Sequence, residues 1–240
     1  MTSVSRHSAG PGFDKRALLR DHPLFGGLGP DLIERLHAHA ITQSIRRGTT
    51  IFAKGDPGAS LFAICSGSVK IAVPASDSRD ALFNVLHAGS IFGEIALLDG
   101  RPRSADAVAM TDCELLVVYR RDFLPLLESR PDIAQKLIEV LCARLRQTTQ
   151  QLEDLMFLDL PCRLAKTLLR LSEGAKPSRG GAKVMLTQRE IGQIIGMSRE
   201  STNKQLRSWE RHRWIRLERG GIVVLAPAAL AAVAAGGEDG

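Results

Sequence analysis

The sequence lacks the features that mark membrane-spanning, disulfide-linked and metal-binding proteins. Its 240 residues include four cysteines, Cys65, Cys113, Cys142 and Cys162, and no two of them form a C-x-x-C pair. Single scattered cysteines indicate reduced structural thiols, so we expect no zinc, no cysteine-ligated cluster and no disulfide framework. No apolar run is long enough to cross a bilayer, and the opening stretch MTSVSRHSAGPGFDKR contains no apolar signal core. We therefore expect a cytoplasmic protein with no membrane partner.

Charge is abundant but unevenly distributed along the chain. Residues 160–240 contain 14 Lys or Arg against 7 Asp or Glu, whereas residues 1–159 contain 18 against 19. A neutral body with a basic C-terminal third indicates that this end binds a polyanion. A solvated basic face is the alternative that charge alone leaves open.

Short β-type runs separated by glycines occupy residues 41–119. Runs such as TTIFAK, SLFAIC, SVKIAV and CELLVVY follow one another at close spacing. This pattern of short apolar runs and glycine turns predicts an antiparallel barrel or jelly roll. A helix over GPDLIERLHAHA is expected to precede it, because Pro30 suits the first turn of a helix.

After Pro131 the apolar pattern becomes helical. A seam of residues recurs at steps of four and three, namely Leu137, Leu141, Leu145, Thr148, Leu152 and Leu155. Such a narrow seam is typical of a long helix that pairs with a partner helix, and packing of one helix on its own barrel is the alternative. Pro161 is expected to end or redirect this helix, which places a domain boundary there.

The stretch LTQREIGQIIGMSREST predicts a helix-turn-helix. Thr187 and Glu190 form a capping box, Gly196 ends the first helix, and Ser198 caps the second. WIRLERGGIVVLAP then alternates around a Gly-Gly turn, which predicts a β-hairpin wing. A loop is expected over GAKPSRGGAK, and a short helix with a tail over the Ala-rich end.

These patterns predict an α+β fold of two globular domains joined by a long helix. The expected segments are a flexible N-terminus over residues 1–22, a jelly-roll β-roll over 23–130, a dimerisation helix over 131–159, a winged helix-turn-helix over 160–228, and a tail over 229–240.

The stretch FGEIALLDGRPRSA, from Phe92 to Ala105, has the chemistry of a nucleotide site. An ionised Glu94 can only accept hydrogen bonds and therefore suits sugar hydroxyls, whereas Arg103 offers a planar set of donors that suits a phosphate. Gly93 lets the backbone pass where a Cβ would intrude.

From about Pro23 to about Pro227 the sequence resembles the cyclic-AMP receptor protein and fumarate-nitrate regulator (Crp/Fnr) family of bacterial transcription factors. Three motifs match in the order of that family. FGEIALLDGRPRSA resembles its phosphate-binding cassette, RQTTQQLEDLMFLD resembles its dimer helix and hinge, and LTQREIGQIIGMSREST resembles its helix-turn-helix.

The resemblance implies a ligand site for cyclic AMP, with Glu94 on the ribose 2′-hydroxyl and Arg103 on the cyclic phosphate. Gly93, Ile95, Ala96 and Ser104 complete the cassette, in which a short helix after Glu94 directs N–H groups at the anion. Thr148 and Thr149 match the family's base-contacting pair of hydroxyl residues. Asn84 replaces a smaller hydroxyl residue near the base, and because an amide both donates and accepts, cyclic GMP is an alternative ligand.

The resemblance also implies recognition of double-stranded DNA by a homodimer, with RNA polymerase as a further partner. Arg199 suits guanine and Glu200 suits cytosine, whereas Lys204 stands where the family's adenine-nucleotide sensors have a second Arg. Candidates for further DNA contacts are Asn203, Ser198, Ser201, Thr202 and Gln188.

We therefore expect a cyclic-nucleotide-responsive transcription regulator that recognises a palindromic, TGTGA-like site. Within the family, a haem or redox sensor and a ligand-independent regulator are alternatives, although cluster-bearing members use N-terminal cysteines and no Cys precedes Cys65 here. An enzyme that hydrolyses cyclic nucleotides is disfavoured, because the sequence has no clustered His and Asp metal ligands and no nucleophile motif.

Overall fold

The structure is a computed structural model of the chain. It describes Ala17, Leu19, Arg20, His22, Phe25, Gly27 and residues 29–74, 81–173, 176–178 and 180–236. The flexible segment predicted over residues 1–22 lies largely outside this described part, as does the end of the predicted tail. The chain divides into two compact units, the first ending at Ala143 and the second beginning at Arg144.

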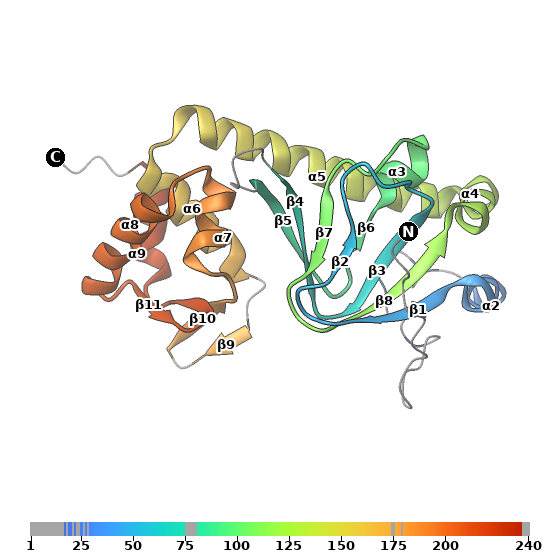
Figure 1. The fold of residues 1–240 in the computed structure, drawn as a ribbon, viewed down its shortest axis with the longest axis horizontal. Coiled ribbons are helices and arrows are strands. Elements are labelled where there is room, and N and C mark those ends of the chain that lie inside the picture. The colour runs from blue at the N-terminus through green and yellow to red at the C-terminus, as the bar shows by residue number, and fades with distance from the viewer. Residues whose placement is uncertain are drawn as a thin grey trace. The chain divides into compact units, whose positions relative to one another are not determined.

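The described residues of the first unit form two four-stranded antiparallel sheets, with strand orders β1-β8-β3-β6 and β2-β7-β4-β5 (Figure 1). The strands are β1 (Ile41–Ile45), β2 (Thr50–Phe52), β3 (Ser60–Ser66), β4 (Ser68–Val73), β5 (Ala81–His87), β6 (Ile91–Phe92), β7 (Asp106–Ala109) and β8 (Cys113–Tyr119). This architecture confirms the predicted jelly-roll β-roll.

The central strand β3 is buried on both of its faces. Phe62 and Ile64 belong to the core between the two sheets, whereas Leu61 and Ala63 belong to a second core under the helices. Successive side chains of a strand point to opposite faces, so a strand covered on both sides reads as a continuous apolar run. The run SLFAIC therefore reflects a strand with no solvent-facing side over most of its length.

Helices cover the outer face of the β1-β8-β3-β6 sheet. They are α2 (Pro30–His39), α3 (Glu94–Asp99), α4 (Arg120–Ser129) and the first part of α5 (Pro131–Phe157). Ile33 of α2, Phe123 of α4 and Ile133 of α5 are at most 1% exposed and share one core with Leu61. The predicted helices α2 and α5 are confirmed, and α4 is an element that the sequence patterns did not predict.

The helix break expected near Pro161 is confirmed, and the proline itself lies in the first turn of the following helix. Helix α5 ends at Phe157, and α6 (Leu160–Glu173) starts before the proline, where a missing backbone N–H costs little. The Asp159 carboxylate accepts a hydrogen bond from the Cys162 N–H at 2.9 Å, and this bond lowers the pKa of Asp159 from its ordinary value. The compact units divide inside α5, upstream of the boundary expected at Pro161, because the end of α5 contacts α6 through Asp154 and Lys166.

The second unit packs helices on a small antiparallel sheet of order β11-β12-β10-β9. Besides α6, its elements are β9 (Lys176–Ser178), β10 (Gly181–Val184), α7 (Gln188–Ile195), α8 (Arg199–Arg211), β11 (Ile215–Glu218), β12 (Gly221–Val224) and α9 (Pro227–Ala234). The wing hairpin and the Ala-rich helix are confirmed. The loop predicted over residues 174–183 is wrong in part, because β10 pairs with β12 and extends the sheet.

Helices α7 and α8 form the predicted helix-turn-helix. Thr187 Oγ1 accepts from the Glu190 N–H at 3.2 Å, and a Glu190 carboxylate oxygen accepts from the Thr187 N–H at 2.9 Å. Gly196 ends α7 with a φ of 70°, a left-handed conformation that suits glycine, and Ser198 caps α8. The local capping chemistry therefore defines both ends of the turn.

Replacement of Thr187 tests this capping. We expect Thr187→Ala to lower the free energy of unfolding of the second unit by about 1 kcal/mol, because the Glu190 N–H in the first turn of α7 loses its acceptor, Thr187 Oγ1. Both tryptophans of the chain, Trp209 and Trp214, lie in this unit, so denaturant unfolding followed by tryptophan fluorescence reports on it. Thr187→Ser is the control and should unfold like the wild type; equal stability of the alanine and serine variants would contradict the cap.

Candidate functional site

Arg103 is the centre of the nucleotide-cassette region of the β-roll. Its backbone is held by the loop after β2, because its N–H donates to the Asp56 carbonyl at 2.8 Å and its carbonyl accepts from the Gly55 N–H at 2.9 Å. The residue is only 4% exposed. A charged side chain is therefore buried at the position where the sequence predicted a phosphate ligand.

The guanidinium of Arg103 is hydrogen-bonded on two of its nitrogens. Nη1 donates to the Gly93 carbonyl at 2.7 Å, and Nη2 donates to the Ser60 carbonyl at 2.8 Å and to Ser60 Oγ at 3.0 Å. Nε is buried and has no hydrogen-bond partner within the described part of the chain. Burial lowers the pKa of Arg103 from its ordinary value, and the negative charges of Glu94 and Asp56 oppose that shift.

Gly93 is required both by its backbone conformation and by its neighbour. Its φ is 81°, and it forms the N-cap of α3. A Cβ at this position would lie 2.6 Å from Nη1 of Arg103, so only glycine leaves room for the guanidinium. The sequence prediction that a side chain at Gly93 would intrude holds, and the group it would displace is Arg103.

Glu94 begins α3 and is 2% exposed. Its charge acts on Arg103, so the structure brings together the carboxylate and the guanidinium that the cassette pattern paired. Of the other cassette residues, Ala96 is buried, Ile95 is half exposed and Ser104 is exposed. An anionic ligand with hydroxyl groups matches this combination of one buried acceptor and one buried donor.

Three further candidates for ligand contact lie outside the cassette. Asn84 is partly buried in β5, where its Oδ1 accepts from the Val85 N–H at 2.9 Å. Thr148 and Thr149 are both exposed on α5 and belong to the second unit, whereas the cassette belongs to the first. Their part in ligand binding stays a prediction.

The apolar seam of α5 has two different environments. Leu137 is buried on the β-roll and Leu141 packs partly against the same core. In contrast, Leu145, Leu152 and Leu155 are 68%, 56% and 46% exposed. The beginning of the helix therefore packs on its own roll, as one of the two interpretations predicted, whereas its end presents apolar side chains to solvent, and pairing with a partner helix stays a prediction.

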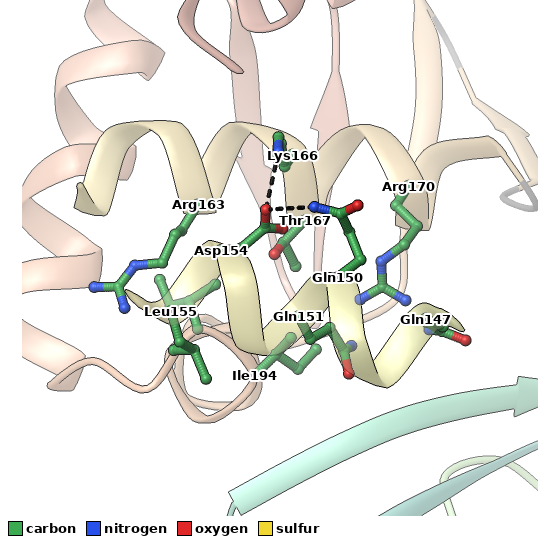
Figure 2. A pocket seen from close by; sticks show the side chains of 11 residues that line it. Gln147, Gln150, Gln151, Asp154, Leu155, Arg163, Lys166, Thr167, Arg170 and Ile194 are labelled. Carbon is green, nitrogen blue, oxygen red and sulfur yellow. Dashed lines mark hydrogen bonds and ion pairs between the residues drawn. The ribbon is translucent and has the colours of Figure 1, made fainter. Parts of the chain in front are cut away.

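The end of α5 contacts α6 and α7 around a cavity of about 290 Å³. Asp154 accepts from Lys166 Nζ of α6 at 2.9 Å and from Gln150 Nε2 of its own helix at 3.2 Å, and Figure 2 shows both contacts. Burial lowers the pKa of Arg170, which also lines the cavity. No local sequence pattern pairs Asp154 with Lys166, because the two residues lie on different helices.

The proposed base-reading residues Arg199, Glu200 and Lys204 are all exposed at the start of α8. Ser198 caps this helix by accepting from the Ser201 N–H at 3.2 Å, Asn203 is partly buried, and Gln188 begins α7.

Thr202 requires a correction. It is fully buried, and its hydroxyl donates to the Ser198 carbonyl at 2.9 Å. It therefore packs inside the helix-turn-helix and is not carried forward as a phosphate contact. Trp209, at 3% exposed, packs beside Trp214 with ring centroids 6.2 Å apart and lies in the core of the winged domain.

The described residues form neither a cluster of metal ligands nor a helix suited to a membrane. No group of three or more His, Cys, Asp and Glu side chains there is placed to hold a metal ion. Of the helices in that part of the chain, none combines the length and apolar character that a bilayer crossing requires.

The sequence patterns did not identify two residues that contact the Arg103 guanidinium, Ser60 and Phe52. Ser60 and Phe52 lie far from the cassette in sequence, in β3 and β2, and neither carries a motif. The Arg103 guanidinium carbon lies 4.2 Å from the centroid of the Phe52 ring. No local signal could have found this contact, because it forms only when the two sheets close.

Comparisons with known proteins agree with these features. The model of the cyclic nucleotide-binding domain matches residues 42–130, and that of the Crp-like helix-turn-helix domain matches residues 162–233. The chain is 37% identical over 204 residues to the CRP-like cAMP-activated global transcriptional regulator of Mycobacterium tuberculosis H37Rv, covering 84% of this chain and 91% of that protein. It is 31% identical over 218 residues to the cyclic AMP receptor protein of Thermus thermophilus, covering 91% and 99%.

Among solved structures, the c-di-GMP responsive global regulator CLP of Xanthomonas campestris is 26% identical with a TM-score of 0.71, covering 82% of this chain and 99% of that chain. FixK2 of Bradyrhizobium japonicum has a TM-score of 0.70 at 21% identity, covering 80% and 96%, which shows a shared fold. Since both domain models match in order, and relatives above 30% identity cover most of its length, this chain belongs to the Crp/Fnr family of transcription regulators, which are DNA-binding proteins rather than enzymes.

Proposed function

We propose that the protein is a homodimeric transcription regulator that is switched by a cyclic mononucleotide, most simply cyclic AMP. The observation that carries this proposal is the buried pair of Glu94 and Arg103 in the cassette. A cyclic nucleotide offers one ribose hydroxyl to the carboxylate and one phosphate to the guanidinium. The relatives in Mycobacterium tuberculosis and Thermus thermophilus, which are named for cyclic AMP, support this ligand.

We assign contact with the base of the nucleotide to residues outside the cassette. Thr148 and Thr149 would supply hydroxyl groups from α5, and Asn84 would lie near the base on the β-roll. Because the Asn84 amide can donate and accept, cyclic GMP is the competing ligand. The Xanthomonas campestris neighbour responds to c-di-GMP, so this dinucleotide belongs in the same binding comparison.

Recognition of DNA is assigned to α8. Arg199 would contact a guanine, Glu200 the cytosine of the next G·C pair, and Lys204 a further guanine or a phosphate, since all three are exposed. Ser198, Ser201, Asn203 and Gln188 would contact the DNA beside them. Two recognition helices related by a two-fold axis would lie one DNA turn, about 34 Å, apart over inverted TGTGA-like half-sites.

We assign the contact between the two copies of the chain to the exposed end of the α5 seam. Leu145, Leu152 and Leu155 present apolar surface on one long helix, and pairing with an identical helix would bury it. A ligand that contacts both the β-roll and α5 binds better to one helix arrangement than to another, and that difference in affinity can shift a two-state dimer. A change near Phe157 to Pro161 would then rotate the DNA-binding domains, and RNA polymerase would be the further partner on DNA.

Arg103→Ala tests the ligand site. We expect it to weaken cyclic AMP binding by about 2–3 kcal/mol, because the phosphate loses a charge-assisted partner in a buried site. Titration calorimetry with cyclic AMP, cyclic GMP and c-di-GMP measures this loss and the ligand preference. Glu94→Ala should also bind more weakly and discriminate less against 2′-deoxy nucleotides. Arg101→Ala is the matched control, since Arg101 is exposed two residues earlier, and it should bind like the wild type; if Arg103→Ala and Glu94→Ala also bind like the wild type, the cassette assignment is wrong.

Thr148→Ala and Thr149→Ala test the switch. We expect either change to alter base preference or nucleotide-dependent DNA binding more than dimerisation, because both side chains are polar groups exposed on α5. Sedimentation, calorimetry and DNA-binding titrations separate the three properties. Arg146→Ala, another exposed site on the same helix, is the control. A threonine variant that dimerises, discriminates between nucleotides and binds DNA normally would remove that threonine from the mechanism.

Lys204→Arg tests how α8 reads DNA. If Lys204 contacts a base, a guanidinium should sharpen the preference at that base pair, whereas a phosphate contact should leave sequence preference unchanged. Selection from random duplexes with saturating cyclic nucleotide measures both outcomes. Arg199→Ala should cost about 1–3 kcal/mol and relax preference at one base pair, while Arg207→Ala, whose side chain pairs with Glu210 at 3.0 Å, should not. Enrichment of non-palindromic sites unrelated to TGTGA would contradict the assignment.

A further inference from the structure

The Arg103 guanidinium is enclosed by groups from both sheets of the β-roll. Hydrogen bonds to Ser60 come from β3 in one sheet, and the ring of Phe52 comes from β2 in the other. The third partner, the Gly93 carbonyl, lies directly after β6. The guanidinium is therefore oriented by tertiary contacts and not by its own loop alone.

Phe52 provides an aromatic face under the guanidinium. The Arg103 guanidinium carbon lies 4.2 Å from the Phe52 centroid and 5.6 Å from that of Phe62, both within the range of cation–π attraction. The Phe52 ring is itself packed against Phe62 and Phe92, with centroids 5.7 and 5.9 Å away. Phe62 and Phe92 are stacked at 5.0 Å. This aromatic cluster fixes the plane on which the guanidinium lies.

Among the described residues, Ser60 is the one side chain that accepts a hydrogen bond from this guanidinium, whereas the other acceptors there are the backbone carbonyls of Gly93 and Ser60. A hydroxyl can also donate, so Ser60 Oγ can serve an anionic oxygen that a carbonyl would repel. The three hydrogen bonds use three of the five guanidinium N–H groups of Arg103, and its Nε–H is buried without an acceptor among the described residues. A buried unpaired donor is costly, and a ligand oxygen would satisfy it.

We propose that Phe52 and Ser60 are positioning residues that hold the Arg103 guanidinium in place before ligand binding, with its Nε–H left for an anionic oxygen of the ligand. This inference rests on the proposed cyclic-nucleotide function. It adds Phe52 and Ser60 to the residues that determine how Arg103 contacts the phosphate. A long arginine side chain that is already fixed loses less conformational freedom on binding, so the pre-orientation raises affinity.

The Ser60 hydroxyl is tested with a pair of variants of equal shape. Ser60→Val removes the hydroxyl, whereas Ser60→Thr keeps it on a side chain of the same size and branching. We expect the valine variant to bind cyclic AMP at least fivefold more weakly than the threonine variant in titration calorimetry, at equal thermal stability. Equal affinity of the two variants would overturn the role of Ser60.

The Phe52 ring is tested in the same way. Phe52→Leu keeps apolar bulk but removes the aromatic face, and Phe52→Tyr keeps that face. We expect about a fivefold loss of affinity in the leucine variant and near wild-type affinity in the tyrosine variant. Phe123→Leu, a buried change in the core under the helices, controls for lost stability. If it weakens binding as much as Phe52→Leu does, the role of Phe52 is only structural.

The state of Arg103 without ligand is read by nuclear magnetic resonance. The Nε–H signal, assigned by its loss in Arg103→Lys, should exchange slowly with solvent in the ligand-free wild type and shift when cyclic AMP binds. It should exchange faster in Ser60→Val and Phe52→Leu. A fast-exchanging signal in the wild type would overturn the pre-orientation even if cyclic AMP binds. If instead no cyclic nucleotide binds, the proposed function fails, and the exchange rates alone decide whether Phe52 and Ser60 hold Arg103.

Discussion

A buried guanidinium connects the two sheets of the β-roll. Arg103 donates to Ser60 in one sheet and lies on Phe52 of the other, with a further bond to the Gly93 carbonyl. Removing such a charge from water is costly unless its donors find acceptors, so the neighbouring backbone must be arranged around it. The left-handed turn at Gly93, the start of α3 and the buried position of Glu94 all accommodate this one group.

The two-sided burial of the central strands provides the rigid frame for that site. In β3, alternate residues face the inter-sheet core and the core under the helices, and β8 behaves in the same way. Ser60 begins β3, so the acceptor for Arg103 stands on one of the most constrained strands of the fold. A site on a packed strand holds its geometry more closely than one on a loop, which suits a ligand pocket whose affinity depends on orientation.

Helix α5 connects the two functions of the chain through two different environments. Its first turns are part of the β-roll core, and its last turns contact α6 through Asp154 and Lys166 while leaving apolar side chains exposed. Helix α5 thus begins after the match to the cyclic nucleotide-binding domain ends at residue 130 and ends before the match to the Crp-like helix-turn-helix domain begins at residue 162.

The sequence by itself determined the order of the elements, the α+β class, the helix-turn-helix with its caps, and the Glu94–Arg103 pair, because these depend on local spacing, capping and turn chemistry. Only the tertiary structure decided that α4, β9 and β10 form, that Thr202 is buried, and that Phe52 and Ser60 hold Arg103. β10 is a strand because β12 lies beside it, and Phe52 reaches Arg103 because the sheets close. Contacts between residues that are distant in sequence produce no local sequence pattern. Each partner, taken alone, resembles any other strand residue.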